Sequence, residues 1–197
     1  MARPKTFDPD RALDKAMRLF WRSGYENTSL EALMCEMGIA KQSLYDTYGD
    51  KRGLYLKALA QYRDQTNGAM QKMLNGIPSV KNGFAKLLYG LARETREQHE
   101  RGCLLLSANL QRDTKDAVLR DFLRDNQATV EAIFGDSLKR AQKEGELSTK
   151  EDPDALARFF VVTIQGMRAM ARLKSDRKAL EQVARVALAV LFNSSKG

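Results

Sequence analysis

A dense run of hydrogen-bonding side chains lies between positions 41 and 51, in the stretch KQSLYDTYGDK. It opens on a lysine, a glutamine and a serine, and a tyrosine, an aspartate and a threonine follow a single leucine. Glutamine and lysine can bind base edges in the DNA major groove, and lysine and hydroxyl groups can bind phosphates. A helical face that displayed these side chains together would therefore have the chemistry of a nucleic-acid contact.

A helix-turn-helix across about residues 29–48 would display them in that way. Thr28 or Ser29 can cap its first helix, and Gly38 ends that helix because the chain must turn there through a positive φ. The second helix spans roughly residues 41–48. Apolar side chains would fix the angle between the helices by packing together: Met17, Phe20, Leu33, Met34, Ile39 and Leu44. A plain helical hairpin with a solvated polar face fits the same pattern.

Helices are also predicted on both sides of this motif. Residues 9–23 begin at a proline, with Asp8 as N-cap, and stop at Gly24. Residues 51–74 follow Asp50, a second candidate N-cap. Apolar residues keep a helical spacing along the rest of the chain, so the fold class is all-α. The further helices are predicted at about 80–91, 103–110, 114–144 and 154–173, with a last helix capped by Ser175.

The charge balance bears on the partner. Hydrophobic residues make up 43% of the 197 residues, which is enough for a sizeable core. The net charge of +8 suggests a polyanionic partner, yet residues 1–53 hold 9 Lys+Arg against 8 Asp+Glu. Total charge is therefore weak support for nucleic-acid binding, and the placement of the side chains must carry that argument.

The sequence also predicts a location. Cys35 and Cys103 are far apart and form no disulfide framework, which suits a reducing cytoplasm. The first residues, MARPKTFD, lack the apolar region of a secretory signal. The longest apolar runs are too short to span a bilayer. We therefore expect a soluble cytoplasmic protein with no membrane partner.

The stretch from Phe20 to Tyr55, FWRSGYENTSLEALMCEMGIAKQSLYDTYGDKRGLY, resembles the N-terminal DNA-binding domain of the TetR family. The matching positions are Phe20, Gly24, Thr28, Leu33, Gly38, Leu44, Tyr45, Tyr48, Lys51 and Leu54. The resemblance implies a three-helix DNA-binding domain over residues 1–53 and a larger helical effector-binding and dimerisation domain over residues 54–197. The segment LARFFVVTIQGMRAMAR resembles the paired helices through which such proteins dimerise.

The resemblance also implies roles at a double-stranded DNA operator. Side chains at the helix starts would bind phosphate, those opening residues 41–48 would reach the groove, and Tyr45 and Thr47 would touch backbone oxygens. The full set is Thr28, Ser29, Lys41, Gln42, Ser43, Tyr45, Thr47 and Lys51. Leu44 and Tyr48 would belong to the core. A homodimer would place two recognition helices about 34–36 Å apart on a near-palindromic site.

Asp46 is unusual on such a face, because a carboxylate repels phosphate. It could accept a hydrogen bond from cytosine N4. A structural role, as a cap or as a partner of Lys51 or Arg52, is the favoured interpretation. Arg3 and Lys5 could reach a minor groove or belong to an unordered tail.

Members of the family generally enclose a small-molecule pocket among their central helices, and the sequence does not name the effector. The side chains that could line it, or equally be plain core, are Phe84, Leu88, Phe122, Phe160 and Met167. Cys103 opens a helix after Gly102, and some electrophile-responsive relatives carry a similar Gly-Cys-Leu segment. It also fits a small buried hydrophobe. His99 has no second soft ligand nearby, so we expect no metal site and place it at a solvated helix end.

The combined interpretation is a ligand-responsive transcriptional regulator. Its simplest form is a repressor that leaves a palindromic operator when a small-molecule effector, such as an electrophile reacting with Cys103, binds the C-terminal domain. The alternatives are an all-helical small-molecule-binding protein or enzyme without DNA binding, and a sequence-independent architectural DNA protein. No phosphate-binding loop, metalloprotease motif or nucleophile elbow occurs, so we expect no catalysis and no cofactor.

Overall fold

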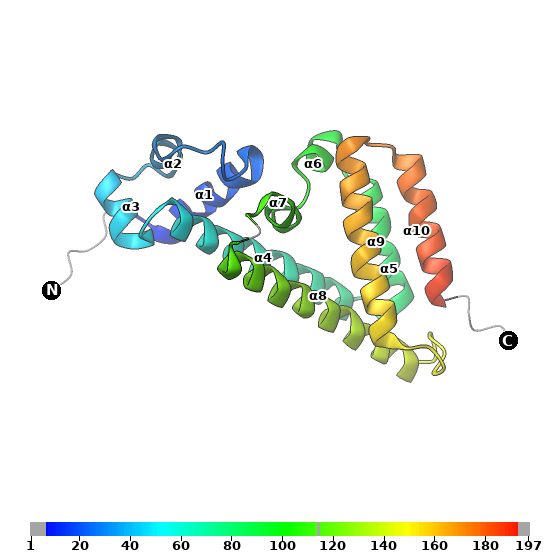
Figure 1. Cartoon of the computed structure of the whole chain (residues 1–197). Helices are drawn as coiled ribbons and strands as arrows, with labels where there is room; N and C mark the ends of the chain where they lie inside the picture. The colour runs from blue at the N-terminus through cyan, green and yellow to red at the C-terminus, as the bar shows by residue number, and fades with distance from the viewer. Residues whose placement is uncertain (1–6, 114, 193–197) are drawn as a thin grey trace. The chain divides into compact units, whose positions relative to one another are not determined.

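The computed structural model describes residues 7–113 and 115–192, and over these residues the chain is helical with no strand (Figure 1). The predicted all-α class is confirmed. The helices are α1 (Pro9–Ser23), α2 (Leu30–Met37), α3 (Lys41–Tyr48), α4 (Lys51–Gly76), α5 (Val80–Ala92), α6 (Arg96–Arg101), α7 (Leu104–Gln111), α8 (Ala117–Lys143), α9 (Pro153–Leu173) and α10 (Arg177–Phe192). Arg3 and Lys5, considered above as minor-groove contacts, lie outside the described residues.

Helix α1 begins and ends where its sequence predicts. The Asp8 carboxylate accepts hydrogen bonds from the backbone N–H groups of Asp10 and Arg11 at 3.0 and 3.2 Å. The first N–H groups of a helix have no partner within it, so this cap fixes the start of α1. Gly24 ends the helix with φ at 79°.

The turn between α2 and α3 contains both hydrogen bonds of a Schellman motif. Gly38 is left-handed, with φ 70° and ψ 37°, and its N–H donates to the carbonyl of Cys35 at 3.3 Å. The N–H of Ile39 donates to the carbonyl of Met34 at 3.2 Å, and Ile39 is buried. The motif therefore redirects the chain at Gly38 and places the next side chain in the interior.

The prediction missed helix α6. The chain restarts there at Thr95, whose hydroxyl accepts from the N–H of Gln98 at 3.2 Å. The Gln98 amide oxygen accepts in return from the N–H of Thr95 at 2.7 Å. This reciprocal pair is a capping box, and its signal T-x-x-Q is present in the sequence at positions 95–98.

Two helix starts also differ from the prediction, because an aspartate supplies the cap in each case. Helix α8 begins three residues later than expected, and the Asp116 carboxylate accepts from the N–H of Leu119 at 3.0 Å. At the start of α10, Asp176 accepts from the N–H of Ala179 at 3.1 Å. The predicted cap, Ser175, is used elsewhere.

Ser175 hydrogen-bonds to His99, and this contact corrects the prediction for the histidine. The Ser175 hydroxyl lies 2.7 Å from Nδ1 of His99, and Nε2 lies 2.9 Å from the carbonyl oxygen of Leu91. His99 has an exposed fraction of only 2%. The expected solvated helix end is therefore wrong: His99 is a buried residue with both ring nitrogens in hydrogen bonds.

The chain divides into two compact units. The first contains the residues up to Thr66 and the segment Cys103–Arg120, and the second contains Asn67–Gly102 and the residues from Asp121 onward. The predicted domain boundary after residue 53 falls inside the first unit. The first unit is discontinuous because α7 and the start of α8 pack with α1 to α4 rather than with the rest of the chain.

Aromatic rings from α1, the following loop and α4 form the centre of the first unit. The ring centroid of Tyr55 lies 4.9 Å from that of Phe20 and 4.7 Å from that of Tyr25. Burial raises the pKa of Tyr55 to about 12. The cluster ties the start of α4 to α1 and to the loop that follows α1 through ring contacts.

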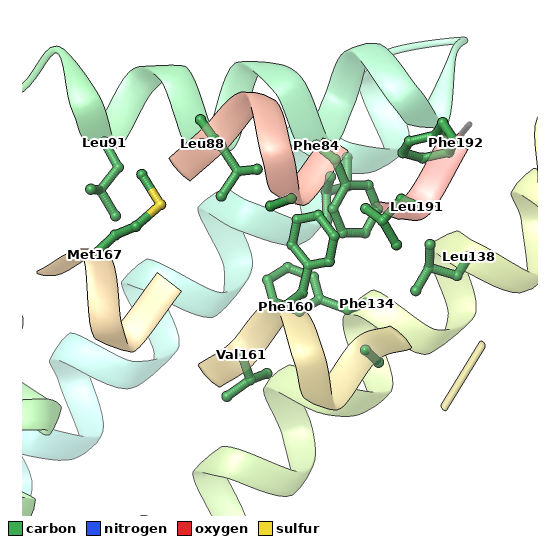
Figure 2. Close-up of a cluster of buried hydrophobic side chains, with 14 of the residues drawn as sticks. Phe84, Leu88, Leu91, Phe134, Leu138, Phe160, Val161, Met167, Leu191 and Phe192 are labelled. Atoms are coloured by element: carbon green, nitrogen blue, oxygen red, sulfur yellow. The ribbon is translucent and has the colours of Figure 1, made fainter. Parts of the chain in front are cut away.

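Phenylalanine rings from α5, α8 and α9 form the core of the second unit (Figure 2). The ring centroid of Phe84 lies 4.5 Å from that of Phe160 and 5.5 Å from that of Phe134. None of these three side chains has an exposed fraction above 1%. Burial of such large apolar surfaces is the main force that holds the helices of this unit together.

Replacement of Gly38 by alanine should lower the free energy of unfolding by about 1–2 kcal/mol, because a Cβ disfavours the left-handed region. No atom lies within 4 Å of a Cβ built at Gly38, so the cost comes from the backbone alone. Gly68 in α4 is the matched control, since it also faces open space. Gly68→Ala should raise the free energy of unfolding by about 0.5–1 kcal/mol. Urea unfolding measures both, and equal effects would contradict the role of Gly38.

Candidate nucleic-acid interface

Helix α3 has one buried stripe and a polar remainder. Leu44 and Tyr48 form the stripe, with exposed fractions of 0% and 6%. The other side chains of the helix are exposed or half-buried: Lys41, Gln42, Ser43, Tyr45, Asp46 and Thr47. These six residues share one accessible surface, the α3 face, which contains every side chain expected to meet the groove.

Tyr48 anchors α3 to the start of α1. Its hydroxyl donates a hydrogen bond to the carbonyl oxygen of Pro9 at 2.9 Å. Burial, followed by the nearby carboxylates of Asp10 and Asp8, raises the pKa of Tyr48. The phenol therefore stays protonated and keeps its donor. The expectation that Leu44 and Tyr48 are core residues is confirmed.

Thr28 and Ser29 differ in role, although both were expected to bind phosphate. The Ser29 hydroxyl is at the surface and caps α2 by accepting from the N–H of Ala32 at 3.1 Å. Thr28 has an exposed fraction of 1%, and its hydroxyl donates to the carbonyl of Gly24 at 2.6 Å. The expected phosphate contact does not fit Thr28, because its side chain closes the α1–α2 turn from inside. Ser29 stays where phosphate can reach it.

Lys51 lies at the start of α4 beside the aromatic cluster. Its Nζ is 4.4 Å from the centroid of the Tyr25 ring, within cation–π distance. Asp50 caps the helix as predicted, by accepting from the N–H of Gly53 at 2.6 Å. Lys51 is thus half-buried at the N-terminus of α4, where the family resemblance predicts a phosphate contact.

Sequence reasoning missed an ion pair between Arg52 and Asp116. Their nitrogen and oxygen atoms are 2.6 Å apart, and both residues belong to the first unit. Hydrogen bonding from the backbone of Leu119, and then from Arg52, holds the pKa of Asp116 below its ordinary value. The partners are 64 positions apart, so no local pattern could have indicated the pair.

A cavity of about 180 Å³ lies in the first unit beside this ion pair. Tyrosine rings, apolar side chains and charges of both signs line it, among them Tyr25, Tyr55, Arg52, Arg112, Asp113 and Leu119. The lining holds two arginines, Arg52 and Arg112, against three acidic residues, Glu26, Asp113 and Asp116.

Asp46 does not take the structural role that the sequence favoured. Arg52 pairs with Asp116, and Lys51 lies over Tyr25. Asp46 instead accepts a hydrogen bond from Nε2 of Gln42 at 2.7 Å, one helical turn away on the α3 face. The aspartate is therefore a partner of a predicted groove-reading residue.

The side chains considered for an effector pocket occupy two kinds of position. Four of them have exposed fractions of 3% or less and belong to the core of the second unit: Phe84, Leu88, Phe160 and Met167 (Figure 2). Phe122 on α8 is half-buried. The first four side chains are therefore part of one packed core. An effector could bind among them only if these packed side chains moved apart.

Cys103 is partly accessible at the start of α7. It is half-buried and occupies the N-cap position of that helix, without a side-chain hydrogen bond to the helix backbone. Its carbonyl accepts from the N–H of Ser107 at 3.0 Å. The thiol is therefore neither sealed in a core nor used as a cap.

Helices α9 and α10 carry an exposed apolar surface, called here the α9–α10 face. Its large side chains are between 38% and 81% exposed: Phe159, Val162, Met170, Leu173, Val183, Val186 and Val190. Those on α9 recur every three or four residues around Gly166, where a Cβ would meet open space. An exposed apolar surface of this kind is a candidate for a protein–protein contact.

Within residues 7–113 and 115–192, no three or more His, Cys, Asp or Glu side chains gather where they could hold a metal ion. In the same residues, no helix is long and apolar enough to cross a membrane.

Two family models match the chain. Residues 12–58 match the model of bacterial regulatory proteins of the tetR family, and residues 83–187 match a tetracyclin repressor-like C-terminal domain. The first match covers the helix-turn-helix with most of α1 and the start of α4.

Known proteins align along almost the whole chain. An uncharacterised HTH-type transcriptional regulator of Bacillus subtilis, YezE, is 32% identical over 97% of this chain and 100% of its own length. The HTH-type transcriptional repressor ComR of Escherichia coli is 33% identical over 92% of this chain and 88% of its own. Among solved structures, a cysteine-substituted variant of the TetR family regulator CifR, complexed with 26-bp operator DNA, is 34% identical. It covers 96% of this chain and 100% of its own, with a TM-score of 0.83.

Proposed function

The chain belongs to the TetR family of bacterial transcriptional regulators, and from that membership we propose that it is an effector-responsive repressor. It binds a near-palindromic operator as a homodimer and leaves it when a small molecule binds the larger helical part. We place the protein in the cytoplasm, where its operator lies, and the proposal contains no catalytic step and no cofactor. In this division of labour the first 53 residues read DNA, and residues 54–197 bind the effector and the second subunit.

The observation that carries the proposal is the α3 face. A helix buried only through Leu44 and Tyr48 leaves six polar or aromatic side chains accessible. Lys41 and Gln42 have the groups that read base edges, and Tyr45 and Ser43 have hydroxyls that bind phosphate oxygens. The operator complex of the CifR variant shows that a protein 34% identical to this chain binds double-stranded DNA.

Footprinting on genomic fragments separates the candidate functions. A repressor of this kind protects one palindromic site with two half-sites about one helical turn apart. An architectural DNA protein covers fragments uniformly, and an enzyme or small-molecule binder without DNA binding protects none. Selection of bound sites from random duplexes then supplies the operator sequence.

Variants on the α3 face and beside it should separate into two classes. Tyr45→Phe and Lys51→Ala should weaken binding to cognate and random duplexes alike, because both residues are proposed to hold phosphate. Gln42→Ala should reduce discrimination between duplexes by about five- to hundredfold while changing random binding little. Fluorescence anisotropy at a fixed salt concentration measures both quantities. Equal losses of discrimination in all three variants would contradict this assignment.

The α9–α10 face is the proposed dimer contact. Its apolar residues form stripes on two neighbouring helices, and Gly166 lets another backbone approach α9 closely. A second copy of the chain presents the same surface, so the contact can close around a two-fold axis. That symmetry matches the two half-sites of a palindrome.

Val186→Asp should weaken the dimer about tenfold or more, because a carboxylate would be buried in an apolar contact. Val186 is 59% exposed in the single chain, so the substitution leaves the fold of one subunit intact. Leu110→Asp on α7, at a position 71% exposed and outside this face, is the matched control. Sedimentation equilibrium decides: a dimer unchanged by Val186→Asp, or weakened equally by Leu110→Asp, would refute the assignment.

Cys103 is the proposed point of reaction for an electrophilic effector. The thiol is partly accessible at the N-cap position of α7. The fully buried pocket candidates in the second unit offer no comparable reactive group. Alkylation would add bulk at the start of α7, which packs in the same unit as the helix-turn-helix.

Treatment with N-ethylmaleimide should therefore release the wild-type protein from its operator and leave Cys103→Ser bound. Cys35→Ser is the matched control, because Cys35 is an exposed cysteine on α2 and its loss should leave the response unchanged. Gel-shift titration measures the bound fraction, and mass spectrometry verifies which thiol is modified. If Cys103→Ser is released as readily as the wild type, Cys103 is not the reacting residue.

A further inference from the structure

The outward centre of α3 is occupied by an acidic residue. With about 100° per residue around a helix, Asp46 lies about 180° from the midpoint between Leu44 and Tyr48, and Gln42 lies about 140° from it. Both side chains are exposed. Asp46 is therefore the residue of α3 that points most directly away from the protein interior, towards any groove that the helix enters.

Gln42 and Asp46 act as one hydrogen-bonded unit. Nε2 of Gln42 donates to Oδ1 of Asp46 at 2.7 Å. An ionised carboxylate only accepts hydrogen bonds, so only the N–H side of the amide can face it and the amide orientation is fixed. What remains for a partner is the Gln42 amide oxygen, its second N–H and the free lone pairs of the carboxylate.

We propose that Gln42 and Asp46 form a base-reading pair that selects bases with an amino group in the major groove. The inference rests on the proposed function of α3 as a recognition helix. Adenine N6 and cytosine N4 are donors in that groove, whereas guanine and thymine present acceptor atoms there. The Asp46 carboxylate accepts from the first two bases and repels the others. Gln42, held in one orientation, suits the donor and acceptor pair of adenine.

The same residue lowers binding to DNA in general. Helix α3 carries one cation, Lys41, and one anion, Asp46, and residues 1–53 hold 9 Lys+Arg against 8 Asp+Glu. Binding without sequence preference depends on neutralising phosphates, so a carboxylate at the centre of the face weakens it. The ratio of specific to non-specific binding rises as a result. Asp46 is therefore a specificity determinant, reading one base itself and positioning Gln42 for another.

The test is selection from random duplexes by the full-length wild type and by Asp46→Asn. An asparagine of the same size can donate as well as accept, so the exclusion of guanine and thymine is lost. We expect the wild-type half-site to contain a column restricted to adenine or cytosine on the contacted strand. In Asp46→Asn, guanine and thymine should gain about five- to tenfold at that column. Binding to random duplex should become tighter.

Three further variants make the outcome specific. Asp14→Asn on α1 changes the net charge equally, where Asp14 pairs with Arg18 at 2.8 Å, and should leave every column unchanged. Asp46→Glu keeps the carboxylate and should keep the restriction. Gln42→Ala should relax the preference for adenine at one column. At that column, the double variant Gln42→Ala with Asp46→Asn should lose less base discrimination than the sum of the losses in the two single variants.

The possible results separate the two claims. If the wild type selects no sequence at all, the proposed function fails. If the wild type selects a palindrome but Asp46→Asn selects the same bases in every column, the base-reading pair is refuted. An effect of Asp14→Asn equal to that of Asp46→Asn would also refute it, because the effect would then be one of net charge.

Discussion

A helix of eight residues does not hold together in water by itself, because the first turn costs more conformational entropy than one hydrogen bond returns. Helix α3 is such a helix, and it has no side-chain cap at its start. Its position therefore depends on the burial of Leu44 and Tyr48, and on the hydrogen bond from the Tyr48 hydroxyl to Pro9. The Schellman turn at Gly38 brings the chain to this contact at the right angle. Because only Leu44 and Tyr48 of α3 are buried, the other six side chains of the helix stay accessible to a partner.

The charges of residues 1–53 favour discrimination between DNA sequences over strong binding to any DNA. Their arginines and lysines are nearly balanced by carboxylates, and several of them are engaged within the protein: Arg18 with Asp14, Arg22 with Glu36, Lys51 over an aromatic ring and Arg52 with Asp116. Weak general attraction to phosphate leaves contacts with bases to supply a larger share of the binding free energy. Dimerisation compensates for this weak attraction, because two helix-turn-helix motifs joined in one dimer bind a palindrome as a single ligand. As the proposed dimer contact, the apolar α9–α10 face would thus contribute to DNA recognition in energetic terms, although its chemistry is that of a protein contact.

The first unit joins segments that are distant in sequence. The Arg52–Asp116 pair connects the start of α4 with the residue before α8, and the aromatic cluster connects it with α1 and the loop that follows α1. Cys103 opens the discontinuous segment of this unit, so a change at that thiol acts within the same packed body as α3. Coupling of this kind needs only a shift in local packing, because close-packed interiors transmit displacement.

Local signals in the sequence determined the helix-turn-helix closely. Asp8, Gly24, Gly38 and Asp50 each act through their own backbone neighbourhood, and the bounds of α1 and α3 agree with the prediction for that reason. Local signals were also present for α6, in the T-x-x-Q box, but were overlooked. Only the structure could decide between the two adjacent candidate N-caps of α10, Ser175 and Asp176. The Ser175 hydroxyl hydrogen-bonds to His99, which is distant in sequence, and Asp176 caps the helix.

The sequence by itself determined the helices other than α6, apart from the exact starts of α8 and α10, and which side of α3 is polar, because hydrophobic spacing and capping act over a few residues. Only the tertiary structure decided that Thr28 and His99 are interior and that Arg52 pairs with Asp116. The hydrogen bond between Gln42 and Asp46 is local, because the two residues are four positions apart on one helix. Burial and ion pairing depend on which surfaces meet across tens of residues. Which residues pair depends on their distance in space. For residues far apart in the sequence, their separation along the chain does not give that distance.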